Sequence, residues 1–218
     1  MLAARGIAYY DLAQYEADDI IGTLAKMAEN TSEAFQITVV SGDKDLIQLT
    51  DENTVVEISK KGVAEFEAFT PDYLMEKMGI TPAQFVDLKA LMGDKSDNIP
   101  GVTKIGEKTG LKLLLEHGSL EGIYDHIDEM KKSKMKENLI NDKEQAFLSK
   151  TLATIDTQSP IEIGLDDTAF KGPNLEKLLA FYDEMGFVHF KNALRGEAVP
   201  QDSDVAYVEP SQVTADHF

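Results

Sequence analysis

Three clusters of acidic residues constrain this chain more than any other feature of its sequence. Each lies where one predicted element gives way to the next: Glu16-Ala-Asp18-Asp19, Asp43-Lys-Asp45 and Asp94-Lys-Ser-Asp97. A fold that gathers these carboxylates at one edge of a sheet needs cations to offset their repulsion, and oxygen-only sites suit Mg²⁺ or Mn²⁺. The clusters therefore predict a divalent-metal site and phosphoryl-transfer chemistry.

The composition is that of a globular chain with one sizeable core. The 218 residues are 43% hydrophobic and include no cysteine, which excludes disulfide frameworks and thiolate zinc sites. The sequence has no apolar run of the ~20 residues that a membrane span needs and no signal-peptide pattern, so we expect a cytoplasmic location. The formal net charge of -18 disfavours a polyanionic partner, although local groups of lysines can still contact phosphates.

The hydrophobic pattern predicts an α/β segment followed by a helical one. Residues 6–10 and 36–40 are predicted strands, with an amphipathic helix over 17–30 between them. A strand pair, 55–59 and 63–69, is expected around a turn at Lys60-Lys-Gly62. The chain turns helical after Thr70-Pro71, and further helices are expected from Pro82 and over 108–117, 120–130 and 136–155.

Both ends of the chain have the pattern of a piece cut from a longer protein. Leu2-Ala-Ala-Arg5 before Gly6 has the pattern of a last helical turn, and one turn cannot nucleate a helix alone. Residues 197–218 have the composition of a linker. We therefore expect further residues before Met1 and a further domain after the tail.

The acid clusters differ in how specifically they indicate function. The first opens a predicted helix, where acids serve equally well as caps and dipole partners. Asp43 and Asp45 follow a buried strand at its carboxyl end, where open α/β sheets place their ligands. Asp94 and Asp97 lie among turn-forming residues, where Asx turns are an alternative explanation. Three such groups in one chain favour the functional interpretation.

The segment Ile99–Thr109 indicates a second kind of chemistry. Gly101 and Gly106 bracket a short turn before a helix, which lets backbone N–H groups approach a phosphate, and Lys104 and Lys108 add charge. This is the layout of a helix-hairpin-helix, which holds a nucleic-acid backbone without reading its sequence. An ordinary interhelical turn would use the same glycines, so the motif alone is a weak signal.

Three long motifs in order resemble the 5′-nuclease (5′-3′ exonuclease) domain of the bacterial DNA polymerase I family, a relative of the flap endonucleases. They are Tyr15–Ala25, Val40–Leu49 and Leu91–Gly101, and the similarity continues through Ile105–Thr109 and Asn141–Ile155. The resemblance covers roughly residues 1–196. One position departs from it, because Gly110 stands where the family usually has Ala.

The resemblance implies a fold and a domain order. Residues 1–92 would form a Rossmann-like PIN/5′-nuclease α/β core, partial because its first strand and arch are missing. Residues 93–196 would form a helical DNA-binding region with the helix-hairpin-helix, whose end could pack back on the core. Residues 197–218 would link to a polymerase-related domain.

The resemblance also implies a site and its substrates. Two Mg²⁺ or Mn²⁺ ions would assist in-line attack on a phosphodiester of 5′ flaps, nicked duplex or RNA-primed DNA during repair and replication, in the bacterial cytoplasm at the nucleoid. The hairpin would hold duplex DNA, and its carbonyls can also bind K⁺. The implied catalytic residues are Asp43, Asp45, Asp94 and Asp97; the implied metal-binding residues are these four with Glu16, Asp18 and Asp19; the implied DNA-binding residues are Gly101, Thr103, Lys104, Ile105, Gly106, Lys108 and Thr109.

Two alternatives remain open at this point. In the family, an N-terminal stretch supplies two further metal-site Asp residues and the arch, so this chain by itself is expected to be weakly active or inactive. It could then act as a non-catalytic duplex DNA-binding module. It could also be another acid-dependent phosphohydrolase, such as a PIN-type ribonuclease or a haloacid-dehalogenase-like phosphatase, for which Asp43-Lys-Asp45 is a superficial match. A small-molecule phosphatase, however, has no use for the glycine hairpin.

Overall fold

The computed structural model describes residues 1–32, 34–60 and 65–196. Residues 11–165 form the larger of two compact units, and residues 1–10 with 166–196 form the smaller one. The predicted linker 197–218 and most of the predicted turn at 60–62 lie outside the described residues. The predicted boundary at residue 92 falls inside the larger unit, and the division between a 1–92 core and a 93–196 DNA-binding region stays a prediction.

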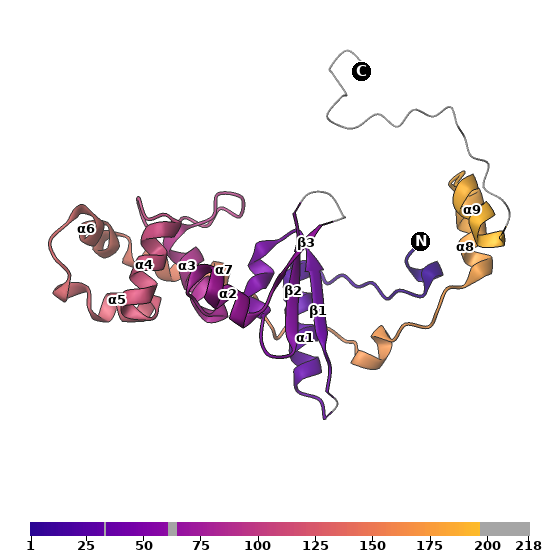
Figure 1. The fold of residues 1–218 in the computed structure, drawn as a ribbon, viewed down its shortest axis with the longest axis horizontal. Coiled ribbons are helices and arrows are strands. Elements are labelled where there is room, and N and C mark those ends of the chain that lie inside the picture. Colours follow the sequence, from indigo (N-terminus) through magenta and orange to yellow (C-terminus); the bar gives the residue numbers. More distant parts are fainter. Residues whose placement is uncertain (33, 61–64, 197–218) are drawn as a thin grey trace, which may run out of the picture. The chain divides into compact units, whose positions relative to one another are not determined.

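A small mixed sheet organises the larger unit (Figure 1). Its strands, among the described residues, are β1 (Ile37–Ser41), β2 (Thr54–Ser59) and β3 (Phe66–Phe69), in that order. β1 and β2 run parallel, whereas β2 and β3 are antiparallel, with Ser59 opposite Phe66. The strands predicted over 36–40 and 55–59 and the antiparallel pairing are therefore confirmed.

Helices make up most of the remainder of the larger unit. A Thr-Pro start opens both α2 and α3, as the sequence predicts, because the Thr side chain accepts an N–H of the first turn and Pro needs no partner there. The helices are α1 (Ala17–Glu29), α2 (Pro71–Met78), α3 (Pro82–Met92), α4 (Glu107–His117), α5 (Leu120–Asp125), α6 (Lys134–Asn141) and α7 (Lys143–Ala153), with 3₁₀ turns η2 (Lys44–Leu49) and η3 (Ile127–Glu129).

Two of the predicted helices are divided. The helix expected over 120–130 is α5 followed by η3, and the one expected over 136–155 is α6 and α7. The second break falls at Asp142, whose backbone has φ -101° and ψ 17° and whose carboxylate accepts the N–H of Thr103. The break therefore coincides with a tertiary hydrogen bond that sequence periodicity does not reveal.

The core of the larger unit is continuous from the sheet into the helices. It joins Val39, Val56 and Phe69 of the three strands to Leu88 and Leu114 of the helical part. α3 lies deep in this core, because every residue from Phe85 to Leu91 is buried. A helix buried on all faces is expected to be apolar throughout. Its two charged residues, Asp87 and Lys89, therefore need partners inside the protein.

The smaller unit is a helical pair with the N-terminal segment packed on it. Its elements are η1 (Ala3–Arg5), α8 (Leu175–Glu184) and α9 (Val188–Arg195), and η4 (Leu165–Thr168) lies at its edge. The guanidinium of Arg5 donates to the hydroxyl of Tyr182 over 2.8 Å. Gly6, with φ +72°, ends η1 in the left-handed region, as predicted for a glycine after a helical turn.

The predicted strand at residues 6–10 is wrong. Residues 7–10 are irregular, and the side chains of Ile7, Tyr9 and Tyr10 are exposed. A strand forms only where a neighbour accepts and donates along its backbone, and this segment has no place in the β1-β2-β3 sheet. The predicted strand-helix-strand unit is corrected accordingly: the parallel pair of the described sheet is β1 and β2, which are joined through η2.

Within the described residues, none of the helices combines the length and the apolar character that crossing a membrane requires.

Candidate active site

The first acid cluster caps α1. Glu16 is the N-cap residue and forms a capping box with Asp19, whose Oδ2 accepts the Glu16 N–H over 3.1 Å. Oδ1 of Asp19 accepts the N–H of Asp156 over 2.8 Å, which ties the start of α1 to the segment after α7. Glu16 and Asp19 therefore have structural roles, whereas Oδ1 of Asp18 accepts the N–H of its neighbour Asp19 over 2.9 Å.

The second cluster lies at the carboxyl end of β1, as predicted. Asp43 is the N-cap of η2, and its Oδ1 accepts the N–H of Asp45 over 2.9 Å. The Asp43 N–H donates in turn to Oγ of Ser41, the last residue of β1. These local bonds fix the chain direction just after the strand and leave Oδ2 of Asp43 free of this turn.

The third cluster lies in the loop after α3. Oδ1 of Asp94 accepts the N–H of Ser96 over 2.8 Å, so the Asx turn weighed from the sequence does form. The backbone groups of Asp94 and Ile99 exchange hydrogen bonds of 2.9 and 2.8 Å, which close the loop into a bridge. The loop therefore holds Asp94 and Asp97 in a defined turn at the end of a buried helix.

The structure gathers the seven predicted acids around two adjoining pockets of the larger unit. One pocket, of about 310 Å³, is lined by six of them: Glu16, Asp18, Asp19, Asp43, Asp45 and Asp97. The other, of about 490 Å³, adds Asp94 and shares Asp43, Asp45 and Asp97 with the first. Three motifs spread over residues 16–97 of the chain thus meet at one place. Their role as metal ligands stays a prediction.

Lys89 lies among these acids, and the sequence reasoning missed it. Its ammonium is 2.6 Å from Oδ1 of Asp45, 2.5 Å from Oδ2 of Asp94 and 3.9 Å from Oδ2 of Asp97. The Lys89 side chain is only 11% exposed. A signal for it exists in the sequence, since a lysine inside the apolar run Phe85–Leu91 needs a buried partner.

The ionisation of the site follows from these contacts. Hydrogen bonds from Lys89 and then Ser96 hold the pKa of Asp94 well below its usual range. Burial raises the pKa of Asp45, and Lys89 offsets this only in part. Burial alone would lower the pKa of Lys89, but its hydrogen bonds to Asp45 and Asp94 outweigh that effect and raise it. Lys89 and Asp94 are therefore a charged pair at neutral pH. Burial also raises the pKa of Asp18, and the charges of Asp19 and Glu16 add to the effect.

The donor set fits a hard divalent cation in chemistry, because all seven side chains offer carboxylate oxygens. Within the part of the chain that the structure describes, no three acid or histidine side chains are arranged as a ready metal-binding group. The ammonium of Lys89 occupies the position between Asp45 and Asp94 that a cation would share. A cation here would therefore compete with Lys89.

The two glycines of the predicted hairpin, Gly101 and Gly106, lie in different surroundings. A Cβ on Gly101, where φ is +64°, would lie 2.3 Å from the backbone nitrogen of Gly93, so Gly101 serves a close approach within the protein. A Cβ on Gly106 would meet nothing within 4 Å. Gly106 is also the exposed N-cap of α4, and no side chain caps this helix end among the described residues. Gly101 thus serves the packing of the turn, and the phosphate-approach role predicted for both glycines stays a prediction.

Four side chains of α6, α7 and their junction contact the hairpin. Asp142 accepts the Thr103 N–H over 2.8 Å, and the side-chain amide of Asn138 donates to the Thr103 carbonyl over 2.8 Å. Gln145 donates to the Gly101 carbonyl over 2.5 Å, and Ser149 Oγ accepts the Gly101 N–H over 3.0 Å. The sequence reasoning missed these residues, although their spacing of four, three and four is a polar stripe at helical period.

The remaining hairpin residues divide by exposure. Ile105 is 5% exposed and belongs to the core, whereas Thr103, Lys104 and Lys108 are exposed. Lys104 has φ +61°, in the left-handed region that L-residues rarely adopt, and is exposed. The two lysines predicted to add positive charge, Lys104 and Lys108, are therefore available on the surface, whereas Ile105 is buried, and the DNA-binding role of all three stays a prediction.

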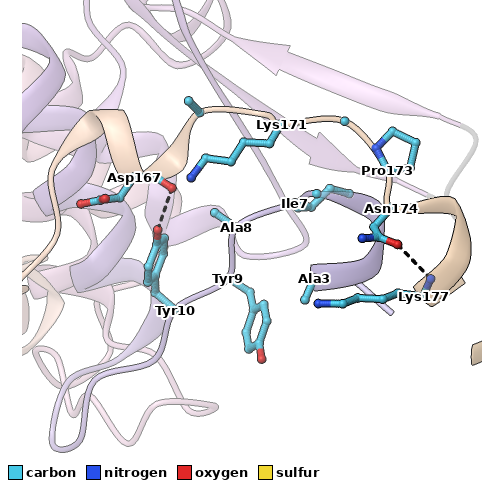
Figure 2. A pocket seen from close by; sticks show the side chains of 13 residues that line it. Ala3, Ile7, Ala8, Tyr9, Tyr10, Asp167, Lys171, Pro173, Asn174 and Lys177 are labelled. Carbon is cyan, nitrogen blue, oxygen red and sulfur yellow. Dashed lines mark hydrogen bonds between the residues drawn. The ribbon is translucent and has the colours of Figure 1, made fainter.

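A separate hollow of about 600 Å³ lies in the smaller unit, between residues 3–10 and 167–177 (Figure 2). The Tyr10 hydroxyl donates across it to the carbonyl of Asp167 over 3.1 Å, and the side chains of Lys171 and Lys177 border it. None of the residues predicted for the metal site or the hairpin lines this hollow.

Comparison with known proteins places these features in a family. Two family models match consecutive parts of the chain: "5'-3' exonuclease, N-terminal resolvase-like domain" over residues 1–79 and "5'-3' exonuclease, C-terminal SAM fold" over residues 80–176. The chain belongs to the 5′-3′ exonuclease family. The resemblance drawn from the three acid motifs is thereby confirmed.

The similar curated proteins are bacterial DNA polymerases I. That of Streptococcus pneumoniae serotype 4 is 71% identical over 216 residues, which are 99% of this chain and 24% of that protein. That of Lactococcus lactis subsp. lactis is 66% identical over 209 residues, covering 96% and 24%, and that of Bacillus subtilis is 46% identical over 204 residues, covering 94% and 23%. The chain spans about a quarter of the length of these curated relatives.

Solved structures agree on the fold. The T5 5′-exonuclease with bound divalent metal ions (zinc) aligns with a TM-score of 0.59 at 26% identity, over 68% of this chain and 53% of that one. The catalytic core of Rad2, solved with DNA substrate, aligns with a TM-score of 0.61 at 18% identity, over 88% of this chain and 63% of that one. The α/β fold class is confirmed as that of the 5′-nucleases.

Proposed function

We propose that this chain is the metal-dependent 5′-nuclease part of a DNA polymerase I, hydrolysing phosphodiesters of 5′ flaps and RNA primers on duplex DNA in repair and replication. The observation that carries the proposal is the gathering of all seven motif acids around two adjoining pockets. Membership of the 5′-3′ exonuclease family supports the reaction class. The zinc ions of the T5 enzyme support the use of divalent cations.

Two Mg²⁺ or Mn²⁺ ions, when bound, would supply an activated water and stabilise the attacking and leaving oxygens of an in-line displacement. The chain's own part is to hold oxygens in place. Asp43, Asp45 and Asp97 line both pockets, so each could offer an oxygen to a cation in either pocket. Asp94 is held ionised by its contact with Lys89. Glu16, Asp18 and Asp19 complete the acidic wall on the α1 side. Lys89 balances the charge of Asp45 and Asp94, and a cation held by these two acids would compete with its ammonium.

The hairpin would hold the duplex. The exposed N-terminus of α4 at Gly106 offers N–H groups to a phosphate, and Lys104 and Lys108 add positive charge beside it. Gly101 and Ile105 are buried and would support the shape of the turn, whereas Thr103 and Thr109 are accessible and would contact the DNA backbone. Such contacts position DNA without reading its sequence. The hairpin carbonyls each keep a second lone pair after their bonds within the protein, which a K⁺ ion could use.

The partners follow from the same proposal. Duplex DNA with a nick or 5′ flap, and RNA-primed DNA, would be the substrates, in the bacterial cytoplasm at the nucleoid. The polymerase domain of the same parent protein would act next on the product. We expect the chain by itself to cleave slowly, because Lys89 lies between two of the catalytic acids and no ready three-acid metal group is formed among the described residues.

The test is cleavage of a labelled 5′-flap duplex with Mg²⁺ or Mn²⁺. Cleavage should stop with EDTA and should fall at least about 100-fold in Asp45→Asn and Asp94→Asn, since each removes a charged ligand. Glu116→Gln is the matched control, because it removes one negative charge from an exposed position of α4 outside both pockets. Cleavage that persists in EDTA, or that Asp45→Asn leaves intact, would contradict the proposal.

DNA binding is tested separately, in EDTA. Lys104→Ala and Lys108→Ala should weaken binding about equally across duplex sequences and each lower the salt slope by about one, because each removes one phosphate contact. Binding without any metal-dependent cleavage would instead favour the non-catalytic duplex-binding module. Preferential cleavage of single-stranded RNA would favour a PIN-type ribonuclease, and turnover of a small phosphomonoester alone would favour a phosphatase.

A further inference from the structure

Four side chains hold the backbone of the hairpin at Gly101 and Thr103, alongside backbone bonds from Val102 to Leu91 and from Ile105 to Val102. The N–H and C=O groups of both Gly101 and Thr103 bond to side chains of residues 138–149. These four groups belong to a turn outside any helix or sheet. Gly101 is buried, and buried backbone groups need partners, so the shape of the turn depends in part on side chains of residues 138–149.

The hairpin also has a conformation that needs external support. Lys104 takes φ +61°, which an L-residue rarely adopts without surrounding constraints. It follows directly on Thr103, whose two peptide groups are fixed by Asp142 and Asn138. The direction of the Lys104 side chain and the position of the α4 N-terminus are therefore set by these bonds.

We infer that Asn138, Asp142, Gln145 and Ser149 are positioning residues that fix the hairpin in the conformation that binds a DNA phosphate. The inference rests on the proposed DNA-binding role of the hairpin and extends it to residues that need not touch DNA. These side chains act through Gly101 and Thr103.

Two features separate this role from ordinary packing. α7 already packs on the core through Ala146, and α6 does so through Leu139, so the four polar side chains are not needed to seat these helices. Asp142 also places a negative charge directly against the hairpin, where it would repel a phosphate. Its bond to Thr103 lowers the pKa of Asp142, so that the charge is retained at neutral pH. A charge that opposes DNA binding is explained if the acceptor it provides shapes the turn.

The decisive experiment compares two pairs of variants that change charge equally, on labelled nicked duplex in EDTA at fixed salt. Asp142→Ala and Asp142→Asn both remove the charge, but only Asn keeps an oxygen that can accept the Thr103 N–H. Gln145→Glu and Asn141→Asp both add a charge, but only Gln145→Glu turns a donor to the Gly101 carbonyl into an acceptor. Asn141 is exposed and makes no hydrogen bond to the hairpin among the described residues.

We expect Asp142→Ala to bind about fivefold more weakly than Asp142→Asn, the effect of one hydrogen bond, and Gln145→Glu about tenfold more weakly than Asn141→Asp. In Asp142→Ala and Gln145→Glu, hydrogen exchange of the backbone amides should be faster than in the unsubstituted chain at residues 101–106 and unchanged in α3 and β2. Equal binding within both pairs, while Lys104→Ala still weakens binding, would overturn the inference and leave the proposed function standing. If Lys104→Ala and Lys108→Ala have no effect, the hairpin role itself fails. Faster exchange throughout the unit, with a lower melting temperature, would assign these residues to stability alone and also overturn the inference.

Discussion

Lys89→Met should destabilise the larger unit more than the loss of an exposed lysine does. The change leaves three carboxylates without their cation at 2.6, 2.5 and 3.9 Å. Breaking a buried ion pair by removing one partner costs about 3–5 kcal/mol. The side chains of Asp45, Asp94 and Asp97 are 14, 23 and 49% exposed, so water recovers part of the loss. We therefore expect about 3 kcal/mol, near the lower limit.

Thermal unfolding by calorimetry in EDTA measures this loss. For a unit of about this size, 3 kcal/mol corresponds to a fall in Tm of roughly 6–12 °C. Lys77→Met is the control, because it removes the same charge from an ammonium that is 41% exposed and pairs with Glu67. An exposed pair of this kind contributes at most about 1 kcal/mol. A Tm for Lys89→Met no lower than that of Lys77→Met would refute the reasoning.

Metal and pH add two further signatures to this variant. Mn²⁺ at 100 times its Kd stabilises a protein by about 2.7 kcal/mol. At one fixed Mn²⁺ concentration, the rise in Tm should be larger for Lys89→Met than for the unsubstituted chain, because Lys89 competes with the cation in the latter. Without Lys89, the pKa of Asp45 rises further above its usual range, and the pKa of Asp94 loses the contact that holds it down. Proton uptake then favours folding as pH falls, so the deficit should shrink from pH 7 to pH 5. A deficit that grows toward pH 5 would contradict this account.

Further predictions concern residues outside the metal site. Lys77 and Tyr73 hold the pKa of Glu67 at about 2, against 4.5 in the unfolded chain. The contribution of Glu67 to stability is therefore present above pH 4.5 and is lost as the pH falls toward 2. The Tm difference between the unsubstituted chain and Glu67→Gln should vanish over that pH range. Gly101→Ala should cost more than ~2 kcal/mol, because φ is +64° and the new Cβ meets backbone at 2.3 Å. Gly110→Ala should change stability by less than ~1 kcal/mol, because better helix propensity offsets a 2.7 Å contact with the movable Leu88 Cδ1; urea unfolding checks both glycines.

The sequence predicts well those elements whose signals are local. The Thr-Pro helix starts, the buried strand at 36–40 and the glycine after η1 all form as predicted, because capping groups and left-handed glycines act within a few residues. The strand predicted at 6–10 fails, because a strand is defined by its neighbour. The break at Asp142 was not predicted, because it depends on Thr103, far away in the sequence.

The site shows the same division. The three acid motifs could be found from residue type and position, and they do meet at the two pockets. Lys89 could not be placed there from periodicity alone, because its partners come from η2 and from the loop after α3. The contacts of residues 138, 142, 145 and 149 with the hairpin were not predicted for a similar reason. These are ordinary polar positions in the sequence, and only the fold brings them to Gly101 and Thr103.

Structural and ligand roles of the acids can be separated by how many oxygens the protein itself uses. Oδ1 of Asp43 accepts the Asp45 N–H, and Asp43→Asn keeps one oxygen for that bond while losing the charge a cation needs. Asp19 uses both oxygens, for Glu16 and Asp156, so Asp19→Asn leaves one N–H facing an amide donor. We expect Asp43→Asn to retain its Tm in EDTA within about 2 °C, and Asp19→Asn to lose about 1–2 kcal/mol, the cost of one capping bond. Both variants should bind Mn²⁺ more weakly, as followed by the metal-dependent rise in Tm. If Mn²⁺ raises the Tm of Asp43→Asn as much as that of the unsubstituted chain, Asp43 is removed from the proposed ligand set. The fold of this variant is expected to be intact, so its response to Mn²⁺ reports only the loss of the carboxylate charge.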